Sequence, residues 1–204
     1  MPTQSEPAMQ PTRLTLVCHA ATPAQKYARF ADDDSVVMDW QSDALSLAGR
    51  FSKPPQLVCG PELRTRQTAS LFGNEATLET ALRDLDMGRW KGQAIDQLDT
   101  HAVRAWLADS AGAPHGGESV DALCERIAQW LKQLQTQPGH VLAVTHPFVI
   151  RAAMLQVLQM PVEMVYRIDV APLSCIELRF TGVWRLRLDT HPWPSEHGNI
   201  HAPH

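Results

Sequence analysis

Short apolar runs that end in polar residues mark three candidate strands along the chain. The runs are LTLVCH over residues 14–19, QLVC over residues 56–59 and VLAVTH over residues 141–146. Buried strands of parallel sheets show continuous apolar runs of this kind, because helices cover both of their faces. The three runs therefore predict buried parallel strands.

Two longer segments show the periodicity of a helix. Apolar residues recur at intervals of three and four over residues 120–134, and Ser119 just before them is a candidate N-cap, since a serine oxygen can accept a free backbone N–H there. A second apolar stripe runs over residues 150–158 and is expected to stop at Pro161, because proline cannot continue a helix. Both segments predict helices with one buried face.

The remaining segments complete the pattern. Residues 62–72 predict a shorter helix that Pro61 opens and a glycine ends. Residues 174–180 and 183–188 alternate around a Thr-Gly pair and predict a hairpin or two sheet strands. Strands separated by helices predict an α/β sheet with helices on both faces.

The composition fits one globular domain with a tail at each end. The 204 residues are 44% hydrophobic and 20% charged, which is typical of a folded chain of single-domain size. We expect the domain over residues 13–190, a polar tail over residues 1–12 and a tail rich in His and Pro over residues 191–204. Histidines without fixed geometry predict a flexible polar tail there rather than a transition-metal site.

Charge and hydropathy argue against several classes of partner. The net charge of −4 argues against a nucleic-acid or anionic membrane surface as the main partner. No apolar run approaches the ~18 residues of a membrane span. The opening MPTQSEPAMQ lacks the basic start and apolar stretch of a secretory signal. We therefore expect a cytoplasmic protein; no pattern in the sequence indicates its oligomeric state.

The ends of the predicted strands carry candidate chemistry. His19 and His146 each follow a buried run, and Arg64 falls in the first turn of the helix after residues 56–59. Ligands of open α/β sheets bind beyond the carboxyl ends of the strands, where helix N-termini present free N–H groups to anions. An arginine in the same crevice can bind a phosphate or carboxylate through two hydrogen bonds. The pattern predicts an anion site with a possible nucleophile.

Five sequence blocks resemble the histidine phosphatase superfamily, also called phosphoglycerate mutase-like, in the order that the family has them. The blocks are LTLVCHAAT, GPELRTRQTA, LRDLDMGRWKG, HGGES and AVTHPFVIR, and the similarity runs from about residue 13 to about residue 160. The resemblance implies a three-layer α/β sandwich with a mostly parallel central sheet. It also implies phosphoryl transfer on a small phosphorylated metabolite, without a metal or cofactor.

The resemblance assigns roles to particular side chains. His19 matches the nucleophile that becomes a phosphohistidine, and Arg64 matches the arginine that clamps the phosphate. His146 matches the second histidine, which donates to the phosphate oxygens, and Asp84 stands where the family carries the acid that protonates the leaving oxygen. Fixed donors around the charged transition state supply most of the catalysis in phosphoryl transfer. Glu118 of HGGES is the alternative acid.

Three further groups are expected to contact the phosphate. Thr22 matches a threonine that follows the family signature, and Gln25 replaces an asparagine found in many relatives. The backbone N–H of Phe148 is a candidate donor at the start of its helix, whereas the preceding proline cannot donate.

Cys18 stands in place of the first arginine of the family signature, and this is the most serious departure from the pattern. A charge-assisted hydrogen bond contributes ~1.5–3 kcal/mol, so its loss could cost roughly 10–150-fold in rate or affinity. A thiolate would repel phosphate, so we expect a neutral thiol that lies at the phosphate site. Arg29 or Lys26, on the loop after His19, could supply the missing cation.

Catalysis by cysteine is not expected. Cysteine-dependent phosphatases need an arginine six positions after the cysteine, and Cys18 and Cys59 have Ala24 and Thr65 at those places. Two functions stay open: a phosphatase that uses a phosphohistidine, and an impaired member that binds a phosphorylated metabolite or partner without turnover.

Substrate specificity is expected from two weakly patterned stretches, residues 26–50 and 86–116, which contain no readable motif. His115, beside two glycines in the second stretch, is expected to be a surface histidine of a loop.

Overall fold

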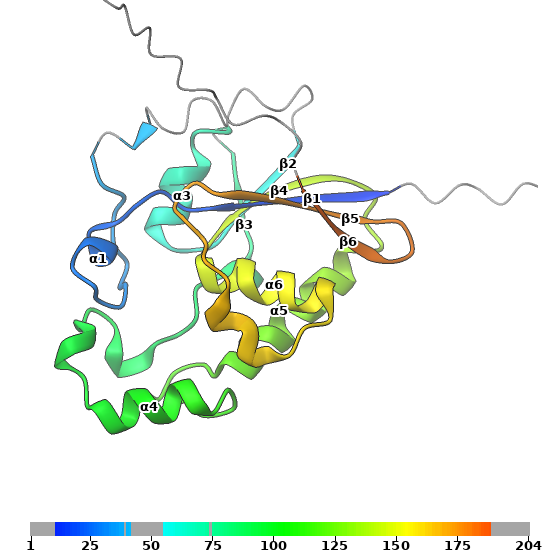
Figure 1. Cartoon of the computed structure of the whole chain (residues 1–204). Coiled ribbons are helices and arrows are strands. Elements are labelled where there is room, and N and C mark those ends of the chain that lie inside the picture. The colour runs from blue at the N-terminus through cyan, green and yellow to red at the C-terminus, as the bar shows by residue number, and fades with distance from the viewer. Residues whose placement is uncertain (1–10, 39, 42–54, 74, 189–204) are drawn as a thin grey trace, which may run out of the picture.

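One six-stranded sheet forms the centre of the chain (Figure 1). A computed structural model describes residues 11–38, 40–41, 55–73 and 75–188. In sheet order the strands are β3 (Thr77–Leu78), β2 (Gln56–Cys59), β4 (Gly139–Thr145), β1 (Thr12–Cys18), β5 (Cys175–Phe180) and β6 (Trp184–Arg187). The first four run parallel to one another, and the last two pair antiparallel. The mostly parallel sheet is confirmed, as are the strands at residues 14–19, 56–59 and 141–146.

Strands β1 and β4 are in register over their whole length. Thr12 pairs with Gly139 at one end and Cys18 pairs with Thr145 at the other. Both strands run in the same direction, so their carboxyl ends meet at one edge of the sheet. His19 leaves this edge with its N–H donated to the carbonyl of Thr145 at 2.9 Å. The register therefore brings the residues after the two strands together.

Helices cover both faces of the sheet, as Figure 1 shows. Leu14 and Leu16 of β1 pack in the cluster that includes α5 (Val120–Leu134) and α6 (Pro147–Leu158). Val17 points to the opposite face, where it packs with Ala69 of α3 (Leu63–Ala69). Alternate strand residues point to opposite faces, so the apolar run of β1 is buried on both sides. The predicted three layers are confirmed.

The helix ends differ in detail from the sequence expectations. Ser119 caps α5 as predicted, accepting the N–H of Ala122 at 3.1 Å. Helix α6 begins already at Pro147, and it ends before Pro161, because Gln159 adopts a left-handed conformation with φ 52°. Such a residue satisfies a free carbonyl of the last turn and stops the helix.

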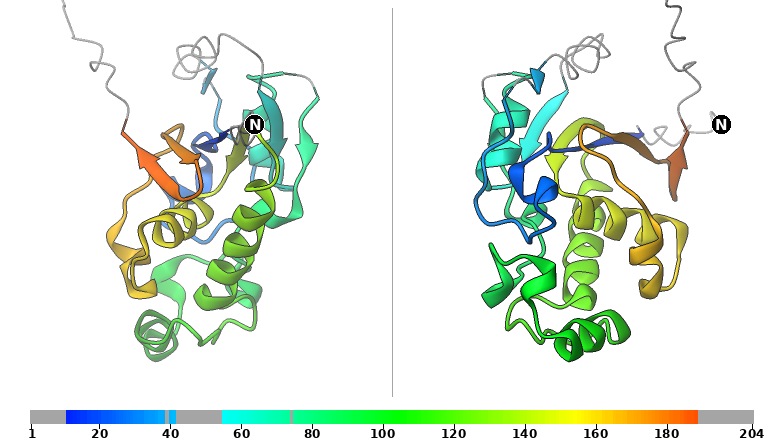
Figure 2. Two further views of the ribbon diagram at one scale, coloured as in Figure 1. Left: turned by 90° about the vertical axis from the view of Figure 1, so that its right-hand side faces the viewer. Right: turned by 60° about the vertical axis from the view of Figure 1, so that its left-hand side comes forward.

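Several short elements have no counterpart in the sequence analysis. They are α1 (Pro23–Lys26), η1 (Thr80–Leu82), η2 (Gly88–Trp90), η3 (Ile95–Gln97), α4 (Thr100–Ala108) and η4 (Val162–Arg167). Figure 2 shows α4, in green, at the bottom of both views and farthest from the sheet. Most of these short elements lie on the side of the sheet where the parallel strands have their carboxyl ends. They therefore surround that edge of the sheet.

The expectation of a surface position for His115 was wrong, because its side chain is 1% exposed. The ring packs against Trp90 at 5.1 Å and against Trp106 at 6.3 Å between centroids. Its Nδ1 accepts the N–H of Gly117 at 3.0 Å. Two tryptophans from separate segments cover the imidazole, and spacing in the sequence gives no sign of that contact.

The predicted boundary of the N-terminal tail is one residue too late. Thr12 already belongs to β1, and its hydroxyl donates to the carbonyls of Leu134 and Gln137 at 3.1 Å each. Residues 1–10 and the predicted tail 191–204 lie outside the described residues. Within the described part of the chain, no helix has the length and apolar character to cross a bilayer.

Candidate active site

His19 lies directly after β1, in the wall of a cavity of about 440 Å³. Its Nδ1–H donates to the carbonyl of Ala20 at 2.7 Å. This hydrogen bond fixes the tautomer and leaves a lone pair on Nε2. Burial and the charge of His146 lower the pKa of His19 to about 3. At neutral pH the ring is therefore an uncharged imidazole with an unprotonated Nε2.

Arg64 enters the same cavity from the first turn of α3 and is 2% exposed. Its Nη1 donates to the carbonyl of Asp32 at 2.7 Å, and its Nη2 donates to Oδ2 of Asp84 at 2.6 Å. Its Nε is buried and has no partner among the described residues. A buried donor without a partner is costly unless a ligand satisfies it. Arg64 is therefore suited to bind an anion.

Asp84 lies beside this guanidinium, in the segment after η1. Its Oδ1 accepts the N–H of Leu85 at 2.9 Å, and its Oδ2 lies 3.4 Å from Nδ1 of His146. Burial acts to raise the pKa of Asp84, but the positive charges of His146 and Arg64 outweigh it and hold the pKa below its usual range. Without a ligand in the site, Asp84 is a carboxylate.

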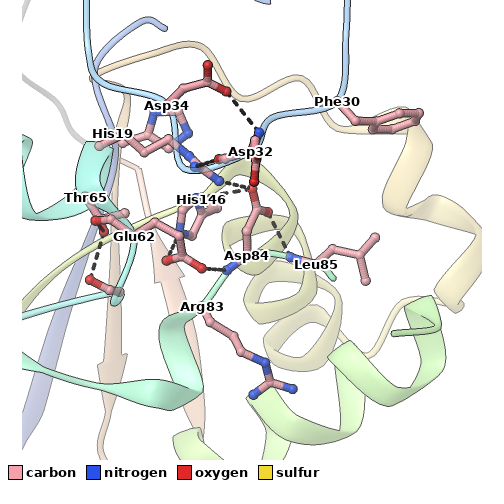
Figure 3. Close-up of polar contacts among 12 residues, drawn as sticks. His19, Phe30, Asp32, Asp34, Glu62, Thr65, Arg83, Asp84, Leu85 and His146 are labelled. Carbon is pink, nitrogen blue, oxygen red and sulfur yellow. Dashed lines mark hydrogen bonds and ion pairs between the residues drawn. The ribbon is translucent and has the colours of Figure 1, made fainter. Parts of the chain in front are cut away.

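His146 follows β4 and is completely buried. Its ring lies edge-on to that of His19, with centroids 5.2 Å apart. Its Nε2 lies 2.8 Å from Oε2 of Glu62, and the other oxygen of Glu62 accepts the N–H of Asp84 at 3.0 Å (Figure 3). The two histidines predicted at strand ends are therefore neighbours in the fold.

Sequence reasoning missed Glu62. A carboxylate just before a helix suggests only favourable placement at the positive end of the helix dipole. Its contact with His146 joins residues 84 positions apart, across the adjacent strands β2 and β4. The nearest available signal is its place two residues before Arg64.

The predicted phosphate-contacting residues also line the cavity, with two exceptions, of which the first is His146, whose fully buried ring lies behind the cavity wall. The lining includes His19, Arg64, Asp84, Thr22, Gln25, Arg29 and Phe148. Arg29 is held by Asp34 through both terminal nitrogens of its guanidinium. Lys26, the other candidate cation, is exposed and its ammonium lies 5.8 Å from the centroid of the Tyr27 ring. Of the two cations, Arg29 is the one in the cavity wall.

The second exception is Cys18, whose side chain is fully buried in an apolar cluster on one face of the sheet and does not line the cavity. Burial and the negative charge of Asp84 raise the pKa of its thiol to about 12. The thiol is therefore neutral, as expected from the sequence. The positive charges that act on it are those of Arg151 and Arg64. The guanidinium of Arg151 lies 5.1 Å from the centroid of the Phe148 ring, which borders the cavity.

Glu118, the alternative acid, is engaged elsewhere. Its carboxylate accepts hydrogen bonds from Arg83 at 2.9 Å and from Arg126 at 2.6 Å, and it is not part of the cavity wall. Of the two candidate acids, Asp84 is the one that lines the cavity. Within the described residues, no group of three or more His, Cys, Asp and Glu side chains has a geometry that could hold a metal ion.

A sequence model of the histidine phosphatase superfamily (branch 1) matches residues 14–188. The chain belongs to this superfamily. Among the structures of similar fold is a variant of phosphoserine phosphatase from Entamoeba histolytica in complex with phosphoserine. It superposes with a TM-score of 0.76 over 86% of this chain and 94% of its own, at 19% identity. That likeness shows the histidine phosphatase fold.

Two curated proteins are similar to this chain at the level of sequence. A glucosyl-3-phosphoglycerate phosphatase of Mycolicibacterium vanbaalenii is 27% identical over 175 residues, which cover 76% of this chain and 78% of that protein. A bifunctional protein of Mycobacterium tuberculosis is 26% identical over 194 residues, which cover 87% of this chain and 53% of that protein. The chain thus spans about half the length of the bifunctional relative.

Proposed function

We propose that this histidine phosphatase hydrolyses a small phosphomonoester through a phosphohistidine on His19, without a metal ion. The observation that carries the proposal is the hydrogen bond from Nδ1 of His19 to the carbonyl of Ala20 at 2.7 Å. It leaves Nε2 unprotonated in the wall of a cavity that also contains Arg64. A neutral imidazole held beside an anion-binding guanidinium is suited to attack phosphorus.

In the first step, Nε2 of His19 attacks phosphorus, an N–P bond forms and the ester P–O bond breaks. The leaving oxygen takes a proton from Asp84. Asp84 must therefore gain a proton when substrate binds. A phosphate dianion supports this, because it competes for Arg64 and its negative charge raises the pKa of the neighbouring carboxyl.

In the second step, water attacks phosphorus and the N–P bond breaks, which returns His19 to its neutral form. The Asp84 carboxylate accepts a proton from the water and releases it to solvent when the product phosphate leaves the site. Splitting hydrolysis into two displacements at one phosphorus replaces one difficult step by two easier ones.

The negative charge of the transferring group needs fixed donors. Nε of Arg64 and Nδ1 of His146 are buried nitrogens without hydrogen-bond partners in the described structure. Arg64 lines the same cavity as His19, and the ring of His146 packs against the ring of His19. The backbone N–H of Phe148, near the start of α6, is a third candidate donor. We assign Thr22, Gln25 and Arg29 to substrate binding because they line the same cavity.

The substrate is proposed to be a small phosphorylated metabolite. A cavity of about 440 Å³ holds more than a phosphate group, and it lies in the size range of small-molecule sites. Its walls combine apolar side chains such as Phe30 and Met87 with charged ones such as Asp86 and Lys91. These residues come from the two stretches expected to set specificity. The name of the glucosyl-3-phosphoglycerate phosphatase relative supports the same class of substrate.

A second function rests on Cys18. Cys18, which the resemblance aligns with the family's first arginine, is a buried neutral thiol that lies outside the cavity wall. A site with one arginine fewer could bind a phosphorylated metabolite or partner without turning it over.

The two functions are separated by one comparison. Hydrolysis of an aryl phosphate is measured with a chelator present, for the wild type and for His19→Ala, while inorganic phosphate binding is measured by titration. Turnover by the wild type that His19→Ala abolishes supports the phosphatase. Phosphate binding without turnover by either protein overturns it and supports the binding function, with Cys18 as the residue to revert to arginine.

A further inference from the structure

Glu62 connects two groups of the candidate site through one carboxylate. It lies between β2 and α3 and lines the cavity. One of its oxygens is 2.8 Å from Nε2 of His146, and the other accepts the backbone N–H of Asp84 at 3.0 Å. Figure 3 shows Glu62 between these two residues. No role is assigned to Glu62 by the mechanism above.

Each ring nitrogen of His146 faces a carboxylate, and this arrangement indicates how many protons the ring carries. Nε2 faces the carboxylate of Glu62 at 2.8 Å, and Nδ1 faces the carboxylate of Asp84 at 3.4 Å. A neutral imidazole has one N–H and one lone pair. One carboxylate would then face a lone pair inside a completely buried site. Among the described residues, the positive Arg64 and the neutral His19 also lie around Asp84 and the ring of His146. Two flanking carboxylates fit an imidazolium whose Nε2–H donates to Glu62, while its Nδ1–H lies 3.4 Å from Asp84 without a hydrogen bond and stays available to a ligand.

The charge of Glu62 agrees with this assignment. Burial acts to raise its pKa, but the hydrogen bond from His146 and the charge of that ring outweigh burial and lower it. Glu62 is therefore ionised. A carboxylate in the wall of a phosphate site repels the ligand unless a cation neutralises it, and the imidazolium of His146 provides that cation.

Gly60 packs directly against the contact between Glu62 and His146. A Cβ at this position would lie 3.0 Å from Oε2 of Glu62, 3.1 Å from Nε2 of His146 and 2.8 Å from the carbonyl of Leu82. The carbonyl is backbone and cannot yield as a flexible side chain would. Glycine therefore leaves the room in which the carboxylate and the ring meet.

We propose that Glu62 is a positioning residue, which holds His146 as an imidazolium with Nδ1–H directed at Asp84 and the reacting phosphate. This inference rests on the proposed function for its catalytic consequence, but the protonation of His146 stands apart from it. Glu62 acts through His146 and does not itself react.

The direct test measures the protonation state of His146 by ¹⁵N NMR of the wild-type protein with labelled histidine. At neutral pH both nitrogens of His146 are expected to carry protons. In Glu62→Gln the amide oxygen can still accept the N–H of Asp84, while the amide N–H₂ donates to Nε2 of His146. The ring is then expected to be neutral, with its one proton on Nδ1. A singly protonated His146 in the wild type overturns the proposal, whatever the variant does.

The kinetic test compares Glu62→Gln with Glu163→Gln, a variant of an exposed glutamate on η4. Loss of a charge-assisted interaction predicts a fall in kcat/KM of about 10- to 100-fold for Glu62→Gln. It also predicts weaker inhibition by inorganic phosphate. Glu163→Gln is expected to match the wild type. Equal kinetics in the two variants would overturn the proposal.

The double variant Glu62→Gln/His146→Gln separates positioning from other effects. If Glu62 acts through His146, the double variant is expected to turn over substrate no more slowly than His146→Gln alone. The effects of substitutions at coupled residues are not additive. Additive losses contradict the proposal. If no form of the protein turns over substrate, the proposed function fails while the NMR result still decides the role of Glu62.

Discussion

Arg64 and Asp84 form an ion pair in which Nη2 lies 2.6 Å from Oδ2. The guanidinium proposed to bind the phosphate is therefore paired with the carboxyl proposed to protonate the leaving group. Arg64 is 2% exposed and also donates to the carbonyl of Asp32. A phosphate that accepts from the unpartnered Nε of Arg64 shares the positive charge of this guanidinium with Asp84. In the proposed mechanism, this shared charge couples substrate binding to protonation of Asp84.

Replacement of Asp84 by asparagine tests that coupling. The amide can still accept from Arg64, but it cannot donate a proton as an acid and has no charge to repel phosphate. We expect inorganic phosphate to inhibit the variant more strongly than the wild type. Turnover of an alkyl phosphate is expected to fall by about 10²–10⁴-fold, the usual contribution of general acid catalysis. Steady-state kinetics with phosphate as inhibitor measure both effects.

The leaving group provides the control for Asp84. An aryl phosphate with a good leaving group needs little protonation, so the loss of turnover in Asp84→Asn is expected to be much smaller with it. Equal losses for alkyl and aryl substrates would contradict the role of Asp84 as the acid.

The thiol of Cys18 is expected to be dispensable. It is fully buried, and burial together with Asp84 raises its pKa to about 12. Because a thiolate is the reactive form, iodoacetamide at mildly alkaline pH is expected to leave Cys18 unmodified in the folded protein. Cys18→Ser is expected to keep activity within about threefold, a change of less than ~1 kcal/mol in the barrier, because the side chain does not line the cavity. Mass spectrometry locates the alkylated thiols, and inactivation by alkylation of Cys18 is the contrary result.

Arg29 is expected to contribute to substrate binding, because it lines the cavity and Asp34 holds its guanidinium in place. Arg29→Met is expected to raise KM and the inhibition constant of phosphate by about 3- to 10-fold with kcat little changed, the pattern of lost uniform binding. Lys26→Met is the matched control, because Lys26 is exposed and does not line the cavity. If both variants keep the phosphate affinity of the wild type, Arg29 does not supply the cation missing at Cys18.

His19 is expected to make the folded protein less stable as the pH falls. Its pKa is lowered to about 3, mainly by burial, whereas the unfolded chain has a value near ~6.5. Between these values the unfolded state binds a proton that the folded state does not, so the free energy of unfolding decreases with falling pH. His19→Gln removes this contribution.

Urea unfolding at about pH 7.5 and about pH 4.5 measures the effect. His19→Gln is expected to lose less stability than the wild type over this interval. An equal loss in the two proteins would show that His19 is readily protonated in the fold.

The sequence predicted the elements that are defined by continuous apolar patterns. Strands β1 and β4 and helix α5 are long enough for their patterns to be clear. Parallel strands then bring His19 and His146 to one edge, so that part of the site followed from topology alone. The short elements around η1 and η2 lack such a pattern, because backbone hydrogen bonds to other loops determine their shape.

Contacts between distant segments could not be predicted in the same way. His115 is buried only because Trp90 and Trp106 close over it. Glu62 meets His146 because β2 and β4 are adjacent and Gly60 leaves space for the contact. Cys18 was expected at the phosphate site, yet its strand position turns the side chain toward α5 and α6. In each case the deciding information is three-dimensional packing, which the spacing of residues does not contain.

The covalent intermediate on His19 is the central claim, and rapid quenching tests it most directly. The wild-type enzyme is mixed with an aryl phosphate, quenched with base within milliseconds and digested, and the peptides are analysed by mass spectrometry under alkaline conditions that preserve phosphohistidine. The account predicts phosphate on the peptide that contains His19, formed and lost at rates compatible with turnover, and none in His19→Gln. Turnover by the wild type without phosphate on that peptide, or undiminished turnover by His19→Gln, would contradict it.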